Sequence, residues 1–167
     1  MSVSTFTVTY THTVTHVANK MMQTLKEIIR EIGLNPAAFI SSWQLYETAL
    51  TTWLGSRHLR RVVLEVYDPK NGALVTRWDI DVAYDTVGEG TLWVNVAALR
   101  YAIAKAGLVA SSCGYRLVFD NAPGRPHVPG MSACEYRSTA GFNRHAVGST
   151  IGGNGITADT AYWSRAC

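Results

Sequence analysis

Residues 14–32, VTHVANKMMQTLKEIIREI, decide the fold of this chain. Apolar side chains recur there every three or four residues, at positions 14, 17, 21, 25, 28 and 32, which is the period of one helical face. Ala18, Met22 and Ile29 widen this face beyond what a helix on a surface usually buries. Gly33 and Pro36 end the helix. We therefore predict a long central helix, with a sheet on one side and further helix on another.

The residues before this helix read as extended chain. Apolar residues at positions 6, 8 and 10 alternate with threonines, a pattern that favours an edge strand or a loose polar arm. Thr11 or Thr13 is expected to cap the helix. His12 and His16 lie four residues apart, but no acidic residue accompanies them, so we expect solvent-facing or capping histidines rather than metal ligands.

A second helix is predicted from Ser41, whose hydroxyl would cap it together with Gln44, to Gly55. Its buried residues would be Trp43, Tyr46, Ala49, Leu50, Trp53 and Leu54. A basic cluster follows, which is either a solvated turn or a docking patch for an acidic partner. The cluster comprises Arg57, His58, Arg60 and Arg61.

The clearest β pattern comes next. Residues 61–67 and 74–82 flank the turn sequence DPKNG and predict a hairpin. Leu74, Thr76, Trp78, Ile80 and Val82 would face the core, while Arg77, Asp79 and Asp81 would form a wet face.

A third helix is expected at Val94–Ala106, with Val96, Leu99, Ile103 and Ala106 facing inward and Gly107 at its end. A further strand follows at Tyr115–Phe119.

From residue 121 onward the chain is rich in Gly, Ser, Thr, Ala and Arg, with scattered large apolar residues. The core is expected to be complete by Phe119, and the remaining segment is expected to wrap around it, because it has little conformational preference of its own. Residues 152–155, GGNG, lack the following helix and lysine of a phosphate-binding loop and predict a flexible turn.

Composition indicates one globular domain: 47% of the 167 residues are hydrophobic and 16% are charged. No apolar run is long enough to span a membrane and no signal-peptide pattern is present, so we expect a soluble, cytoplasmic protein. A net charge of +3 falls short of a nucleic-acid-binding signature. The three widely spaced cysteines favour neither a disulfide framework nor a zinc site. We expect no metal and no cofactor.

No catalytic or phosphate-binding motif occurs in the chain. Cys134 with His127 or His145 is the one combination that could be drawn as a nucleophilic dyad, and no third group marks either histidine as oriented. We therefore predict a protein that is not an enzyme and has no catalytic residues.

The order of these elements resembles the HORMA domain, and more closely the bacterial HORMA proteins of CBASS anti-phage operons. The likeness is carried by the Thr-rich arm and helix of Thr5–Leu34, the hairpin that ends in RWDIDV at residues 77–82, and the segment after Phe119. It implies an α+β fold, with three helices packed on a mainly antiparallel sheet. Residues 1–167 would form a single domain, with a core and N-terminal arm in 1–119 and the family's mobile safety belt in 120–167.

The resemblance also implies a signalling adaptor. In the closed form of such domains the belt encloses a short closure-motif peptide that adds a strand to the sheet. The closed protein would bind and activate a cGAS/DncV-like nucleotidyltransferase that makes a second messenger, and a TRIP-like AAA+ ATPase would open it again. Because the chain ends soon after Trp163, the peptide would come from another protein, or the belt would close empty.

The residues assigned to these roles follow from that resemblance. The peptide would contact Tyr115, Arg116, Leu117, Val118, Phe119, Phe142, Tyr162 and Trp163. The ATPase would engage the arm residues Ser2, Val3, Ser4, Thr5 and Phe6.

Two alternatives remain open. One is a small α+β module that binds an anionic ligand or nucleic acid through arginines. The other is an enzyme that uses Cys134 or a histidine. The arginines in question are Arg57, Arg60, Arg61, Arg125, Arg137 and Arg144.

Overall fold

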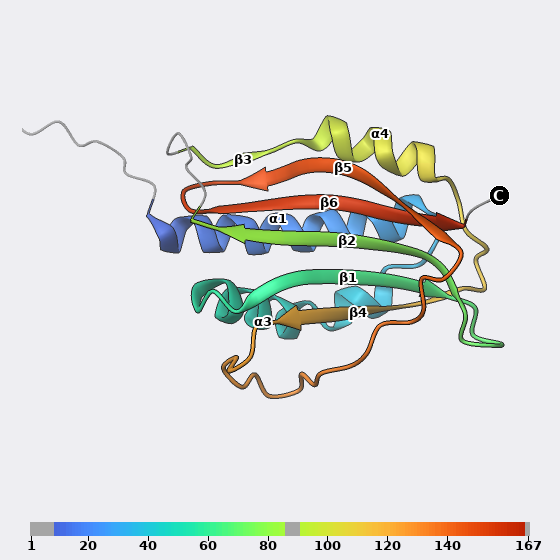
Figure 1. The fold of residues 1–167 in the computed structure, drawn as a ribbon, viewed down its shortest axis with the longest axis horizontal. Helices are drawn as coiled ribbons and strands as arrows, with labels where there is room; N and C mark the ends of the chain where they lie inside the picture. The colour runs from blue at the N-terminus through green and yellow to red at the C-terminus, as the bar shows by residue number, and fades with distance from the viewer. Residues whose placement is uncertain (1–8, 86–90, 166–167) are drawn as a thin grey trace, which may run out of the picture.

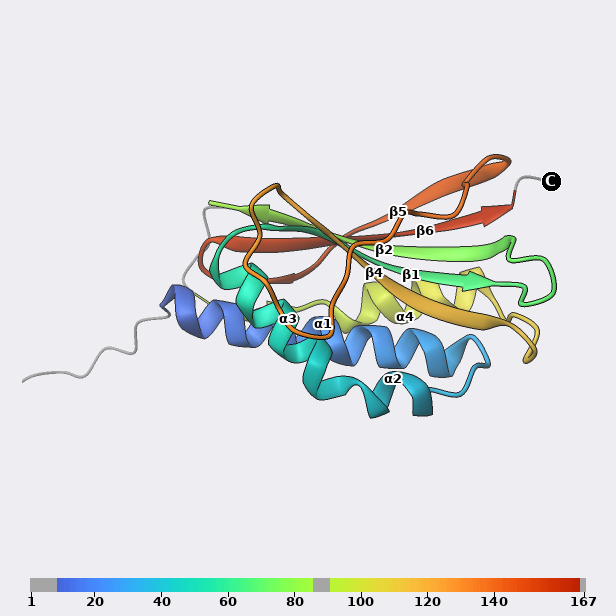
Figure 2. The same ribbon diagram turned by 90° about the horizontal axis from the view of Figure 1, so that it is seen from below.

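The structure, a computed structural model, describes residues 9–85 and 91–165 and has two layers, a sheet and a set of helices that cover one of its faces (Figures 1 and 2). Residues 1–8, which include the predicted ATPase-engaged arm of Ser2–Phe6, lie outside the described residues. The elements in chain order are α1 (Tyr10–Glu31), α2 (Ala37–Ser41), α3 (Trp43–Gly55), β1 (Leu59–Tyr67), β2 (Leu74–Tyr84), β3 (Trp93–Val94), α4 (Val96–Ala106), β4 (Gly114–Asn121), β5 (Phe142–Gly152) and β6 (Ile156–Arg165).

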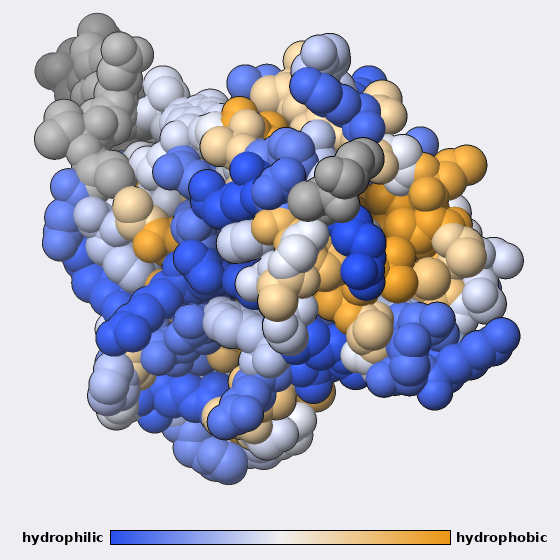
Figure 3. Space-filling view, turned by 45° about the vertical axis from the view of Figure 1, so that its right-hand side comes forward, coloured by the Kyte–Doolittle hydropathy of each residue, from blue (hydrophilic) through white to orange (hydrophobic). Residues whose placement is uncertain are grey.

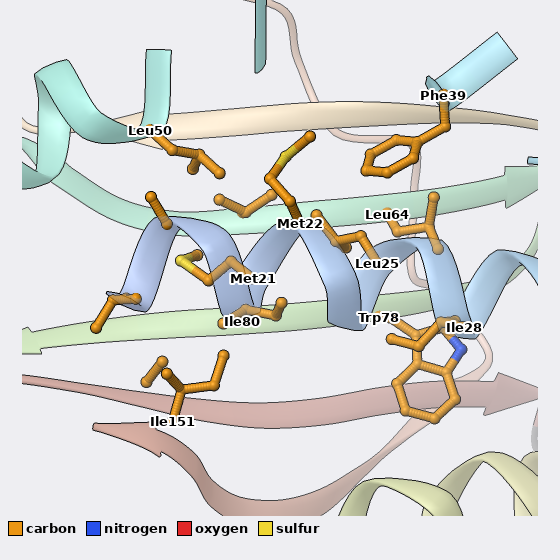
Figure 4. Close-up of a cluster of buried hydrophobic side chains, with 14 of the residues drawn as sticks. Met21, Met22, Leu25, Ile28, Phe39, Leu50, Leu64, Trp78, Ile80 and Ile151 are labelled. Atoms are coloured by element: carbon orange, nitrogen blue, oxygen red, sulfur yellow. The ribbon is translucent and has the colours of Figure 1, made fainter. Parts of the chain in front are cut away.

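Helix α1 is central, as predicted: it packs on β5 and β6 of the sheet and is in contact with both α3 and α4. Met21, Met22, Leu25 and Ile28 are fully buried along it (Figure 4). Each such side chain contributes roughly 1.5–3 kcal/mol relative to an exposed position. Gly33, with φ of +97°, ends the helix in the left-handed conformation that only glycine adopts without strain.

The start of α1 differs from the prediction. Thr9 is the N-cap, and its hydroxyl accepts a hydrogen bond from the His12 backbone N–H at 3.1 Å, so the predicted caps at Thr11 and Thr13 are wrong. Tyr10, predicted to be extended, is the first helical residue, and its hydroxyl donates to the Leu54 carbonyl at 2.7 Å. This partly buried tertiary contact outweighs the weak local β preference of the threonine-rich sequence.

The predicted second helix is found as α3, which begins two residues later than predicted, and a short additional helix, α2, precedes it across Ser42. The predicted capping pair of Ser41 and Gln44 is not formed, because the Ser41 hydroxyl donates back to the Ala38 carbonyl at 2.7 Å. Helix α3 packs on α1 and buries Leu50 and Trp53, as expected. Residues 9–85 and 91–165 therefore contain four helices on one sheet, where three were predicted.

The sheet has the strand order β3-β5-β6-β2-β1-β4, and every pairing is antiparallel. The predicted hairpin is confirmed as β1 and β2, in a register that pairs Leu64 with Trp78. Strand β4 pairs with the other side of β1 and places Leu117 beside Leu64. The predicted α+β class and antiparallel sheet are confirmed.

The predicted wet face of the hairpin is wrong. Arg77 is 4% exposed and Asp79 is 0% exposed, and Glu65 on β1 is also fully buried. Alternation placed these side chains correctly on the face opposite the helices, but it could not show that residues 135–137 and Trp163 cover that face.

The core is not complete at Phe119, contrary to the prediction. Ile151, Ile156 and Tyr162 are buried in it, and β6 lies inside the sheet between β5 and β2. In the described part of the predicted belt, residues 122–141 wrap irregularly, while residues 142–165 form a β-hairpin, interrupted by two register shifts, that turns at GGNG, residues 152–155.

Helix α4 begins at Asn95, whose side chain caps it by accepting from the Ala98 N–H at 3.1 Å. Leu99 and Ile103 face inward as predicted, but Val96 is 41% exposed.

Figure 3 shows a face on which hydrophilic residues predominate and apolar residues gather toward one side. No helix in residues 9–85 and 91–165 is both long and apolar enough to cross a membrane. The exposed large apolar side chains are Ile40, Trp93, Val96, Tyr101 and Leu108.

Candidate functional site

The two outer strands of the sheet differ in how their free edges are protected. Strand β4 pairs with β1 from Gly114 to Asn121, with one register shift whose extra residue, Arg60, lies on β1, and no strand in the described part of the chain pairs with its other edge. The opposite edge strand, β5, pairs with β3 at Ile151 and Gly152 and carries two register shifts. Bulges of this kind make an edge a poor template for a further strand. The regular open edge of this sheet is therefore β4.

A loop crosses beside this edge. Residues 122–141, which we call the covering loop, join β4 to β5 and pass from the helical side of the sheet to the opposite side (Figures 1 and 2). Between β4 and the loop lies an open groove of about 640 Å³. Its walls are the end of β4 and two parts of the loop. The lining residues are Val118, Phe119, Asp120, Asn121, Ala122, Pro123, Gly124, Arg125, Ala133, Cys134, Glu135 and Tyr136.

On the helical side the covering loop is held by α3. The Trp53 indole N–H donates to the Pro126 carbonyl at 2.8 Å, and the Arg125 guanidinium lies over the Trp53 ring, 4.6 Å from its centroid. Val128 is buried in the main core. Gly130, with φ of +88°, approaches Leu45 so closely that a Cβ would lie 3.2 Å from its methyl group. Apolar packing and one strong hydrogen bond thus anchor the first half of the loop.

On the opposite face the loop is held by a buried carboxylate. Glu65, fully buried on β1, accepts from the Arg116 Nε at 2.6 Å, from the Arg137 Nη1 at 2.9 Å and from the Arg137 backbone N–H at 2.6 Å. A buried charge is tolerated when opposite charges and hydrogen bonds surround it, as they do here. The Arg116 Nη2 also donates to the Glu135 carbonyl at 2.6 Å.

Tyr136 completes this attachment. Its hydroxyl donates to the Asp120 carboxylate at 2.8 Å, and Arg77 lies over its ring, 4.4 Å from the centroid. Burial is the main cause that raises the pKa of Tyr136 well above its ordinary value, and the hydrogen bond to Asp120 acts in the same direction. Glu65, Arg116, Asp120, Tyr136 and Arg137 together form what we call the outer clasp.

The Arg77 side chain that lies over Tyr136 is itself held in place by Asp79. Its Nε donates to Asp79 at 2.7 Å, and the Trp163 indole N–H donates to the same carboxylate at 3.1 Å. The outer clasp therefore rests on a second set of buried polar contacts that joins β2 to β6.

The predicted peptide-binding residues of β4 lie along the open edge strand. Tyr115 and Phe119 point to the helices: the Tyr115 hydroxyl donates to the Asn35 carbonyl at 2.8 Å, and the Phe119 ring meets Trp53 edge to face. Leu117 shares their face by alternation, whereas Arg116 and Val118 face the other way. Of these five residues, Val118 and Phe119 line the groove.

The other three predicted contacts lie elsewhere. Phe142, Tyr162 and Trp163 belong to β5 and β6, which β2 and β1 separate from β4. Tyr162 stacks between Trp78 and His145, with centroid distances of 4.9 and 4.8 Å. The eight predicted residues therefore do not form one site. The arm residues Ser2–Phe6 lie outside the described residues.

Sequence reasoning missed the loop residues that complete the groove. Glu65 was the available signal, because one acidic residue inside the apolar run of β1 indicates a buried charge with partners elsewhere in the chain. Nothing in the local sequence shows that those partners are Arg116 and Arg137.

The arginines that suggested an anion-binding surface are mostly engaged within the fold. Arg57 pairs with Asp85, Arg61 with Asp81, and Arg137 with Glu65. Arg144 also reaches Asp81, at 3.4 Å. Their charges are balanced by neighbouring carboxylates, so this geometry does not favour an anion or nucleic-acid site. Cys134 is exposed on the groove wall.

Solved structures with a similar fold share little sequence with the chain. A chain of the Mitotic Checkpoint Complex crystal structure superposes with a TM-score of 0.73 and 10% identity, covering 90% of this chain and 99% of that one. C. elegans HTP-2 bound to the HIM-3 closure motif gives 0.68 and 11%, with coverage of 90% and 91%. The E. coli MS115-1 CdnC:HORMA-deltaN complex gives 0.63 and 13%, with coverage of 100% and 94%.

Comparison with the curated proteins finds no significant match. The model of the family described as bacterial HORMA domain 2 matches residues 1–166, almost the whole chain. Together with the shared fold, this match shows that the chain belongs to the bacterial HORMA domain 2 family.

Proposed function

We propose that this HORMA domain binds a short closure-motif peptide of another protein as an added strand along the outer edge of β4. The observation that carries the proposal is the regular, unpaired edge of β4 with a groove between it and the covering loop. A peptide in extended conformation would form main-chain hydrogen bonds with that edge and fill the groove with alternate side chains.

In this proposal the covering loop is the part of the safety belt that encloses the peptide. The loop is attached to α3 on one side of β4 and to β1 on the other, so it passes around the place that the peptide would occupy. The hairpin of β5 and β6 forms the rest of the predicted belt, residues 120–167, and is paired with β2 in the sheet. HTP-2, whose fold is similar, is bound to a closure motif in its own structure, which supports this proposal.

We further propose that the peptide-bound form binds and activates a cGAS/DncV-like nucleotidyltransferase in anti-phage defence. The E. coli relative is solved as a complex with CdnC, and this supports the choice of partner. In the same proposal a TRIP-like AAA+ ATPase engages residues 2–6 and opens the domain. An enzyme assay tests the activation: the peptide-loaded chain should raise nucleotide synthesis by a CdnC-type enzyme, and the peptide-free chain should not.

Hydrogen exchange tests where the peptide binds. The probe is the strongest peptide recovered from a phage-displayed library of random dodecapeptides selected on the full chain. Binding should protect alternate amides of β4, those that point away from β1, because these gain ladder partners. The free edge of β5, residues 142–149, is the internal control and should be unchanged. Protection of that edge in place of β4, or recovery of no binding peptide, would contradict the proposed function.

A further inference from the structure

One buried polar group on the groove wall lacks a partner. Both the amide nitrogen and the amide oxygen of Asn121 are buried, and no described residue hydrogen-bonds to either. Within the described residues only the Trp78 indole nitrogen shares this state, and it lies in the core. Asn121 is the last residue of β4 and lines the groove.

An unsatisfied amide in this position is unfavourable for the empty protein. Buried polar groups are nearly always hydrogen-bonded, and an apolar side chain of similar shape would avoid the loss of hydration. An amide that is orphaned in the empty groove is therefore a candidate for completion by whatever fills the groove.

The main chain just beyond Asn121 has no free N–H group at the next two residues to donate to a ligand in the groove. The next residue, Ala122, uses its N–H to donate to the His58 carbonyl at 2.7 Å, and Pro123 has no N–H. A strand added to β4 that extends past Asn121 would thus lose its ladder of main-chain partners at this point. The Asn121 side chain carries both a donor and an acceptor there.

We propose that Asn121 is a main-chain clamp for the bound peptide, and that its side-chain amide pairs with the N–H and C=O of one peptide residue just beyond the end of the β4 ladder. This inference rests on the proposed function of the same groove. It assigns the contact to the peptide backbone, so the clamp would hold peptides of different sequence while fixing how far they slide along β4. The Asn121 side chain would thereby add one more pair of hydrogen bonds beyond the end of the main-chain ladder between β4 and the peptide.

Asn121→Leu tests the clamp, because leucine has nearly the same shape and no polar atoms. Loss of two hydrogen bonds should weaken the library-selected peptide at least about tenfold. The variant should unfold at the same temperature as the wild type or higher, because the orphan amide is gone. Asn143→Leu, at an exposed position of β5, is the control and should leave the peptide Kd unchanged.

Either of two results would overturn the clamp. If Asn121→Leu binds the peptide within threefold of the wild type, the amide does not hold the peptide. If Asn121→Leu unfolds at a clearly lower temperature, the amide has a partner inside the fold and is structural.

A series of peptides methylated at one backbone nitrogen at a time separates main-chain from side-chain recognition. At the clamped residue, methylation should weaken binding to the wild type and have little further effect on Asn121→Leu, as expected for two changes that remove one interaction. If the loss caused by Asn121→Leu instead disappears when one peptide side chain is truncated, the contact is to that side chain and the main-chain assignment is wrong.

These outcomes are distinct from failure of the proposed function. Recovery of no binding peptide on the wild-type chain removes the peptide site and the clamp together. A peptide that protects β4 from exchange and binds Asn121→Leu equally well removes the clamp alone.

Discussion

Glu65 is the single residue on which the closed arrangement of the covering loop depends most. Its carboxylate has no exposed surface and accepts hydrogen bonds from Arg116 of β4 and from both the side chain and the backbone N–H of Arg137 in the covering loop. Removing one member of a buried charge cluster leaves its partners without an opposite charge. The resulting loss of folding stability is larger than any stability that the intact cluster adds compared with apolar residues of similar size.

Glu65→Gln should therefore destabilise the protein by about 2–3 kcal/mol, because Arg116 and Arg137 keep their positive charge and are partly exposed. Urea denaturation measures the change. Glu27→Gln is the matched control, since Glu27 pairs with Arg30 on the exposed surface of α1, where a pair contributes roughly 0–1 kcal/mol. Equal effects of the two substitutions would mean that the buried charge has no special role.

Because of Tyr136, the folding stability of the protein should depend on pH in the alkaline range. Burial and the hydrogen bond to Asp120 raise its pKa in the folded protein. Above pH of about 10 an unfolded tyrosine loses its proton while folded Tyr136 keeps it, so the folded state binds more protons and stability falls as pH rises. Burial raises the pKa of Tyr84 in the same way, so part of the fall is due to that residue.

Tyr136→Phe should cost about 1 kcal/mol at pH 7, because the hydrogen bond to Asp120 is lost. The difference from the wild type should shrink between pH 9 and pH 11, where only the wild type carries this titration. Denaturation curves at both ends of that interval measure it. Tyr101→Phe, at a side chain that is 72% exposed, should match the wild type throughout. A deficit for Tyr136→Phe that stays constant with pH would refute the assignment.

At the scale of elements, the turn between β5 and β6 is seated on the first turn of α1. The Asn154 backbone N–H donates to the Thr13 hydroxyl at 3.0 Å, and a Cβ added at Gly153 would lie 2.8 Å from side-chain atoms of Leu92 and Thr13. The C-terminal hairpin is thereby held against the start of the central helix.

Gly153→Ala should loosen this contact and destabilise the protein by about 1–3 kcal/mol, the usual range for overpacking. Hydrogen exchange should increase at residues 150–157 and in the first turn of α1. Gly55→Ala is the control, because no atom lies within 4 Å of its added Cβ. Since alanine is more favourable than glycine in a helix, this substitution at the end of α3 should stabilise the protein by about 0.5 kcal/mol. If Gly153→Ala is as stable as the wild type, the Leu92 and Thr13 side chains can move to accommodate the added methyl group, and the contact is not as tight as its geometry indicates.

The elements differ in how much of them could be predicted from sequence. Helix α1 and the hairpin of β1 and β2 have strong periodic patterns, and both were predicted correctly. Strand β5 was not, because register shifts at Ala146/Gly148 and Ser149/Ile151 interrupt the alternation that marks a strand. The same shifts that disguise β5 in the sequence protect its edge in the structure.

The site was predicted less completely than the fold. The sequence pointed to the strand that contains Tyr115–Phe119, which lies at the open edge of the sheet, because a strand followed by a Gly-rich segment is recognisable locally. It could not show that Trp163 lies on the far side of β2, or that Asn121 and Tyr136 face one groove. Those relations depend on pairings between residues far apart in the chain, which local periodicity does not encode.

At the scale of the whole molecule, the covering loop connects opposite sides of the sheet around β4, with both of its ends fixed in secondary structure. A peptide with free ends could pass beneath the loop, whereas a peptide with a folded domain at each end could enter only if the loop leaves its attachments. We expect the second kind of peptide to bind much more slowly, and Glu65→Gln to restore much of its association rate by weakening the outer clasp. Stopped-flow fluorescence measures both rates. Equal association rates for the two kinds of peptide on the wild type would show that the loop opens freely.

The same connectivity separates lifetime from affinity. A ligand threaded through a closed ring and stoppered at both ends is a rotaxane, and it is retained by topology even when its contacts are weak. A protein sequence captured midway between two bulky neighbours would stay on this domain until the ring is broken mechanically or by unfolding. The rate of release would then be set by how often the covering loop leaves its attachments, and not by the strength of the contacts that the captured sequence makes.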